Sequence, residues 1–125
     1  MKRTNPLSPI LILAAAALLT AASDGDWLQH VPEKERMRSN PVAFDKDAMG
    51  AGAKLFQQHC AACHGATAEG KNKHPNLHSE VVQGARPGEL QWLLTNGSLR
   101  RGMPSWSRLP EEQRWQLVVY LKSLR

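Results

Sequence analysis

The 125-residue sequence predicts an all-α fold with three main helices, at residues 48–63, 87–96 and 110–124. In all three segments apolar residues recur at the spacing of one helix face, and no alternating apolar and polar run is long enough to predict a strand. In the first segment the residues that share a face are Gly52, Phe56, Cys60 and Cys63.

The first 23 residues have the features of an export signal. Lys2 and Arg3 precede an apolar run at residues 10–22, which is shorter than the roughly 20 residues of a membrane span. Small residues at positions 21–23 are typical of a signal peptidase site. We therefore predict that residues 1–23 are a signal peptide and that the protein is periplasmic. The alternative is that this segment is not cleaved and anchors the protein in the membrane. We predict membrane association only in that case.

Residues 24–44 are polar, contain two prolines and are predicted to be an N-terminal extension that wraps the main domain, residues 45–125. Within the first predicted helix, Gly52 is costly, because a glycine inside a helix destabilises it by about 1 kcal/mol relative to alanine. Gly52 either marks a close crossing by another helix or is a tolerated glycine in an Ala- and Gly-rich segment.

The other two helices have recognisable ends. Pro87 suits the first turn of the second helix, and Gly97 ends it. Pro110 opens the last helix, where Glu111 lies at the positive end of the helix dipole and Lys122 at the negative end. Apolar residues cover so much of the circumference of this last helix that it is predicted to pack on more than one side.

Cys60, Cys63 and His64 form a C-x-x-C-H motif, which is typical of covalent haem attachment. Residues at positions i and i+3 share one face of a helix, so both sulfurs can reach the two vinyl groups of a porphyrin. His64 then lies where its imidazole can bind the iron. The sequence has only four Trp, two Phe and one Tyr, so a cofactor would also complete a small core.

A disulfide and a zinc site are two other uses that a pair of cysteines can have. A disulfide between Cys60 and Cys63 would close too short a loop to stabilise the fold. A zinc site could be formed with His74 and His78 in the spacing C-x2-C-x10-H-x3-H, which is close to that of a zinc finger. The intervening stretch lacks the apolar positions of a finger, which favours haem.

Five motifs in order resemble a small, single-haem bacterial cytochrome c of class I. They are G-x-x-x-F-x-x-x-C ending at Cys60, CAACHG, HPNLH, NG…GMPSW and WQLVVYLKSL, and they extend over about residues 52–124. The resemblance implies the cytochrome c fold around one covalently bound haem c, with the last helix crossing the first at Gly52. It also implies that the carbonyl of Pro75 accepts a hydrogen bond from the His64 imidazole, and that Leu77 is a further haem-binding residue.

Met103 is the predicted sixth iron ligand, because the M-P motif of the family falls there. By default a methionine fills gaps in a core. Met49 lies about 16 Å along the first helix from Cys60 at 1.5 Å per residue, and Met37 is in the extension. His74 and His78 lie on either side of Pro75 in the sequence, and the resemblance places both on the His64 side of the haem.

With both axial positions filled, the predicted function is one-electron transfer between periplasmic redox partners, such as a dehydrogenase, oxidase or reductase, by a monomeric carrier that is not an enzyme. A haem-bearing subunit of a larger dehydrogenase or oxidase complex is one alternative. A haem enzyme or sensor is another, if Met103 does not bind the iron.

The positive charge of the mature chain is small and is not concentrated in one patch, which argues against a nucleic-acid-binding surface. Without Lys2 and Arg3, 14 Lys and Arg residues face 11 Asp and Glu residues, and the excess of +3 is scattered. Cations near the predicted haem edge are either solvated or dock an acidic partner: Lys71, Lys73, Arg100, Arg101 and Arg108. Trp106 is the candidate for an apolar docking contact.

Overall fold

The computed structural model describes residues 24–125, and this part of the chain contains helices and loops but no strand. The predicted all-α class is therefore confirmed; the predicted signal peptide lies outside the described residues. The elements are, in chain order, the 3₁₀ turn η1 (Asp26–His30), α1 (Glu33–Arg36), α2 (Ala48–His59), α3 (Ala61–His64), α4 (Glu80–Gly84), α5 (Pro87–Asn96), the 3₁₀ turn η2 (Leu99–Arg101) and α6 (Glu111–Lys122).

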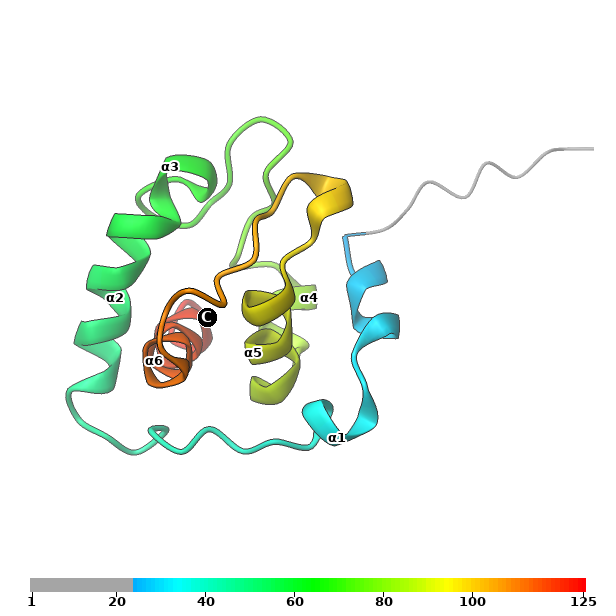
Figure 1. The fold of residues 1–125 in the computed structure, drawn as a ribbon. Helices are drawn as coiled ribbons and strands as arrows, with labels where there is room; N and C mark the ends of the chain where they lie inside the picture. The colour runs from blue at the N-terminus through cyan, green and yellow to red at the C-terminus, as the bar shows by residue number, and fades with distance from the viewer. Residues whose placement is uncertain (1–23) are drawn as a thin grey trace, which may run out of the picture.

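The prediction of one continuous helix over residues 48–63 is wrong. The helix breaks at Cys60, whose φ of −116° and ψ of −33° depart from helical values. The amide of Cys60 still donates to Phe56 O at 2.8 Å, while its carbonyl accepts from the His64 amide at 2.9 Å and so begins a new turn. Figure 1 shows the chain turning from α2 into α3 at this point. Cys60 consequently lies at the bend and Cys63 lies in the turn that follows it, so the two are not on one straight helix.

The helices α2 and α6 cross in direct backbone contact. A Cβ atom placed on Gly52 would lie 2.1 Å from Gln116 O and 2.9 Å from the Cβ of Tyr120. One turn further along α2, the centres of the Phe56 and Tyr120 rings lie 5.1 Å apart. The predicted crossing at Gly52 is therefore confirmed, and the absent side chain is what permits it.

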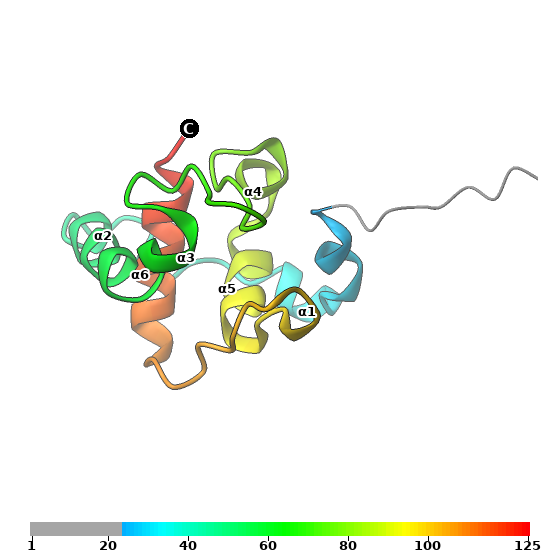
Figure 2. The ribbon, with the colours of Figure 1, turned by 90° about the horizontal axis from the view of Figure 1, so that it is seen from above.

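The helix α6 is packed on two sides, as its apolar circumference predicted. It lies between α2 and α5 in Figure 1, and Figure 2 shows the same order from above. Trp115, Leu117 and Val118 are almost completely buried, with exposed fractions of 1 or 2 %. The helix α5 has the predicted bounds, and α6 is one residue shorter than predicted at its N-terminal end and two residues shorter at its C-terminal end.

Part of the segment predicted as an extension, residues 24–44, contacts the rest of the described chain through α1. The helix α1 lies beside α5, and the chain then follows the edge of the fold to reach α2 (Figure 1). None of the helices within residues 24–125 has both the length and the apolar character to cross a membrane.

Candidate functional site

A cavity of about 820 Å³ lies between the α2–α3 segment and the α5 side of the fold. This volume falls in the range of about 300–1,000 Å³ that is typical of ligand pockets. Its deep walls are apolar side chains from α2, α4, α5, α6 and the loop before α4: Phe56, Leu77, Val82, Leu90, Leu94 and Leu117.

All six residues singled out from the sequence line this cavity. They come from three segments that are separated along the chain, namely the α3 region, the loop before α4 and the loop after η2. They are Cys60, Cys63, His64, Pro75, Leu77 and Met103. The fold thus brings two thiols, an imidazole and a thioether to one apolar cavity.

The imidazole of His64 is oriented by the backbone. Its Nδ1 lies 3.1 Å from Pro75 O, the contact that the resemblance implied. Burial lowers the pKa of His64, while the hydrogen bond to Pro75 opposes this shift and the neighbouring His74 adds to it. The ring is therefore neutral at neutral pH. Because Nδ1–H donates to Pro75, the lone pair of Nε2 is available to bind a metal.

The two cysteines are both free thiols. Cys60 is half-buried and Cys63 is exposed, so the pair lies where the cavity meets solvent. Burial, with a smaller contribution from Cys63, raises the pKa of Cys60 to about 11. Cys60 is therefore a protonated thiol at neutral pH.

The zinc set considered from the sequence is not assembled. Among residues 24–125, no three or more His, Cys, Asp or Glu side chains are grouped so that they could hold a metal ion. The ring of His78 is engaged elsewhere, with Nδ1 at 2.6 Å from Leu124 O and Nε2 at 2.8 Å from Thr67 O.

Met103 is half-buried and held by a tight loop. Its carbonyl accepts from the Ser98 amide at 2.9 Å, and its amide donates to Ser98 O at 3.1 Å. The amide of Trp106 donates to Leu94 O at 2.8 Å, which ties the following residues to α5. Residues of this loop and of α3 both line the cavity, and Figure 1 shows the two segments at the same end of the fold.

The sequence reasoning missed several cavity residues. Asp24 and Trp27 of the extension line the cavity, as do Val81 and Val82 of α4. The helix α4 has only five residues, too few for a periodic pattern, and the polar composition of the extension concealed its apolar pair at positions 27 and 28.

Residues 47–121 match the family described as cytochrome c oxidase, cbb3-type, subunit III. The chain belongs to this family of class I c-type cytochromes. The cytochrome is 32 % identical over 100 residues to the cbb3-type oxidase subunit FixP of Sinorhizobium medicae (strain WSM419), covering 72 % of this chain and 34 % of that subunit. It is 39 % identical over 79 residues to FixP of Bradyrhizobium sp. (strain ORS 278), covering 59 % and 27 %. It thus spans about a third of the length of these subunits.

Two further relatives are separate cytochromes. Cytochrome c550 of Pseudomonas aeruginosa is 28 % identical over 144 residues, and the alignment covers 99 % of this cytochrome and 97 % of that one. The crystal structure of cytochrome cL from Methylophaga aminisulfidivorans superposes with a TM-score of 0.57 and 28 % identity, covering 66 % of this cytochrome and 59 % of that chain. The cytochrome c fold and the electron-transfer function of the family follow from these matches.

Membership of the family implies a covalently bound haem c, and the residues present fit such a group. The cavity is large and apolar, two free thiols lie at its edge, and a neutral imidazole on its wall is oriented by a backbone carbonyl.

Proposed function

We propose that this cytochrome carries single electrons on one haem c that is joined to Cys60 and Cys63 by thioether bonds, with His64 and Met103 as the axial ligands of the iron. When bound, the haem supplies reversible one-electron chemistry at its iron. The observation that carries the proposal is the convergence of the six predicted residues, from three segments, on one apolar cavity.

The chain's own residues have defined tasks in this proposal. Pro75 O accepts the Nδ1 proton of His64, which fixes the plane of the imidazole and raises the basicity of Nε2. The paired backbone hydrogen bonds between Ser98 and Met103 hold the thioether on the cavity wall. If His64 and Met103 both bind the iron, the thioether of Met103 would favour the reduced state and so raise the reduction potential.

Filling both axial positions from the protein leaves no coordination site for a substrate, and this makes the protein a carrier and not an enzyme. If Met103 did not bind the iron, the vacant position would allow a haem enzyme or a sensor. Relatives that are named simply as cytochromes support the carrier function.

The proposed setting is the periplasm, after export directed by residues 1–23, where the protein would shuttle electrons between redox partner proteins. The match to cytochrome c550 over nearly the full length of both chains supports a small carrier, which we expect to be a monomer. A second candidate is an electron-transfer subunit of a larger oxidase complex, which the family match supports. Size-exclusion chromatography of the protein from its native cells distinguishes the two, because a carrier elutes as a small free protein.

Covalent attachment gives the first test. Acid–acetone extraction should leave the colour with the protein, and the mass should exceed that of the polypeptide by one haem, because thioether bonds survive the treatment. Cys60→Ala and Cys63→Ala should each impair maturation. His78→Ala is the control, since the His78 ring contacts Thr67 O and Leu124 O and not the cavity. Colour that moves into the solvent, or bound zinc in place of haem, would reject the proposal.

Charged docking gives the second test. Lys73, Arg100 and Arg101 line the cavity, so an acidic partner would be steered toward it. The rate of electron transfer to such a partner should fall as salt rises from about 0.01 to 0.15 M, because the screening length shrinks from about 30 to about 8 Å. Arg100→Glu should slow the reaction, whereas Lys46→Glu, an equal charge change at an exposed site that does not line the cavity, should slow it less.

Two of the cations suggested by the sequence are unsuitable for this test. Arg101 pairs with Asp24 at 3.3 Å and Asp26 at 3.5 Å, so its reversal would place like charges together. The guanidinium of Arg108 lies 4.3 Å from the centre of the Trp106 ring. A rate that does not depend on salt would contradict charged docking and would favour an apolar docking contact. Leu99 is the better candidate for this contact, because its side chain is 75 % exposed, whereas Trp106 is only 8 % exposed.

A further inference from the structure

The N-terminal extension supplies one wall of the cavity, although it lies outside the residues that match the family. The match begins at residue 47, whereas Asp24 and Trp27 line the cavity. Trp27 is half-buried and packs against the hydrophobic core. A Cβ atom on the neighbouring Gly25 would lie 3.4 Å from a methyl group of Val81, so the extension also closes against α4. This side of the cavity is built by the extension and not by the family domain alone.

A partly buried ion pair, in which Glu89 is the buried partner, anchors the extension to α5. Arg36 Nη1 donates to Glu89 Oε1 at 2.7 Å, and Glu89 is only 5 % exposed. The other guanidinium nitrogen, Nη2, donates to Leu28 O at 3.0 Å and to Val31 O at 3.3 Å. One arginine therefore joins the segment directly after Trp27 to the first turn of α5.

The same anchor is reinforced by a backbone contact. A Cβ atom on Gly88 would lie 2.1 Å from Glu35 O, so α1 and α5 touch without an intervening side chain. Glu89 Oε2 also accepts from the Arg86 amide at 2.7 Å and thereby caps α5. Replacing Arg36 alone would leave the Glu89 carboxylate buried without its charged partner, which is strongly destabilising.

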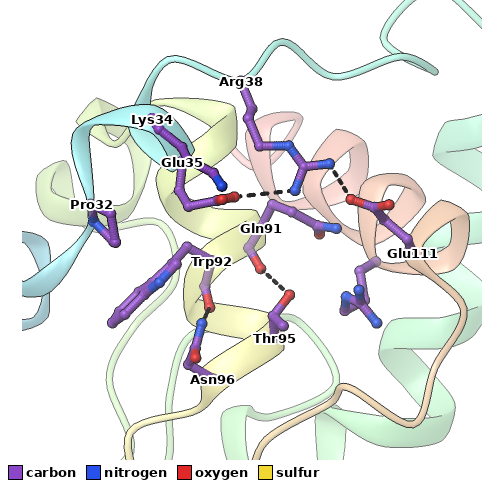
Figure 3. A pocket seen from close by; sticks show the side chains of 10 residues that line it. Pro32, Lys34, Glu35, Arg38, Gln91, Trp92, Thr95, Asn96 and Glu111 are labelled. Atoms are coloured by element: carbon purple, nitrogen blue, oxygen red, sulfur yellow. Dashed lines mark hydrogen bonds and ion pairs between the residues drawn. The ribbon is translucent and has the colours of Figure 1, made fainter.

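Further along, the extension is held by polar contacts around a second, smaller hollow. This hollow has a volume of about 490 Å³ and lies between the extension and the outer face of α5, with Arg38 bridging Glu35 and Glu111 at its rim (Figure 3). The side-chain amide of Asn40 then donates to Trp115 O at 3.0 Å. The extension is thus attached at separate points and not by continuous apolar packing.

The third attachment is next to the Met103 loop. The guanidinium of Arg101 in η2 forms two ion pairs with the residues just before Trp27. Its Nη1 lies 3.3 Å from Asp24 Oδ1, and its Nη2 lies 3.5 Å from Asp26 Oδ2. The start of the extension is therefore tied to the segment that ends in Met103. Between this attachment and the Arg36 anchor, Trp27 has little freedom to leave the cavity wall.

We propose that Trp27 is a cofactor-contacting residue that excludes water from one side of the haem cavity and so raises the reduction potential, with Arg36 as its positioning residue. The inference rests on the proposed function, since it requires haem in this cavity. Solvent access and local dielectric control the potential of a metal site. Oxidised iron carries one more positive charge than reduced iron, and a drier surrounding disfavours the more highly charged state.

The test compares holoprotein variants by their midpoint potential. Trp27→Ala should shift the potential downward, and Trp27→Phe should retain most of the wild-type value because it keeps an aromatic wall. Phe44→Ala is the matched control, since Phe44 is an aromatic residue of the same extension but is fully exposed. The double variant Arg36→Gln/Glu89→Gln removes the anchor without leaving a buried charge, and it should shift the potential in the same direction as Trp27→Ala.

The same variants give a readout that is independent of redox chemistry. Trp27→Ala should accelerate hydrogen exchange of the Ser98 and Met103 amides, which are hydrogen-bonded beside this wall, and Phe44→Ala should not. If Trp27→Ala does not fold, Trp27→Leu is compared with Phe44→Ala in its place.

Failures of the two proposals are distinguishable. Equal potentials in Trp27→Ala and Phe44→Ala, with haem still covalently attached, would overturn this inference and leave the proposed function intact. A loss of stability without a shift in potential would overturn it as well, since that is what a purely structural tryptophan predicts. Haem extracted from the wild-type protein by acid–acetone would instead reject the proposed function.

Discussion

Gly52→Ala is expected to lower the free energy of unfolding by about 1–3 kcal/mol, the usual cost of forcing extra atoms into a packed contact. The new methyl group would lie 2.1 Å from Gln116 O and 2.7 Å from its carbonyl carbon. These are backbone atoms of α6, which cannot rotate away as a side chain could. The two helices must therefore separate, and the loss is measured by urea unfolding of the holoprotein.

Gly50→Ala is the matched control, because it lies in the same helix and nothing is within 4 Å of the position its Cβ would take. There the gain in helix propensity is unopposed and should stabilise the protein by about 0.5–1 kcal/mol. The two substitutions, two residues apart, should therefore have opposite signs. Equal stabilisation by both would show that α2 and α6 do not meet at Gly52.

Met103→Ala is expected to abolish the weak near-infrared band that arises between a methionine sulfur and oxidised haem iron, and to lower the reduction potential. Met103 lies on the cavity wall and is fixed through Ser98. Under the proposed ligation, alanine at this position would leave the iron without its thioether. A thioether favours reduced iron, and its loss removes that preference. Absorption spectra of the oxidised protein and a potentiometric titration measure the two effects.

Met49→Ala is the corresponding control, since Met49 is 53 % exposed and does not line the cavity. It should preserve both the band and the potential. A band that persists in Met103→Ala would contradict the proposed ligation. A wild-type protein that lacks the band would instead support the alternative of a haem enzyme or sensor.

The residue pattern was sufficient to predict the helical class and much of the architecture. The positions of α5 and α6 follow from local signals, the proline at one end and apolar residues at helical spacing. The crossing at Gly52 was implied by the family resemblance. A glycine within a helix does not by itself indicate which helix crosses there, and the resemblance indicated the last helix. The C-x-x-C-H motif and the M-P motif pointed to residues that the fold brings to one cavity, because such motifs record what a cofactor requires of neighbouring atoms.

The break at Cys60 was outside the reach of periodicity. The apolar spacing from Gly52 through Cys63 is compatible with one straight helix, and only the backbone angles at Cys60 show that it bends. A change at one residue alters the direction of the chain without altering the order of apolar positions.

By itself, the sequence determined the helical class and the C-x-x-C-H motif, and its resemblance to a family indicated the crossing at Gly52, since each depends on residues close together in the chain or on a recognisable pattern. Only the tertiary structure decided that Trp27 belongs to the cavity and that Arg36 pairs with Glu89, 53 residues away. A polar segment can be a solvated tail or part of a wall, and its composition is the same in both cases. The difference lies in long-range contacts, which no local pattern of residues encodes.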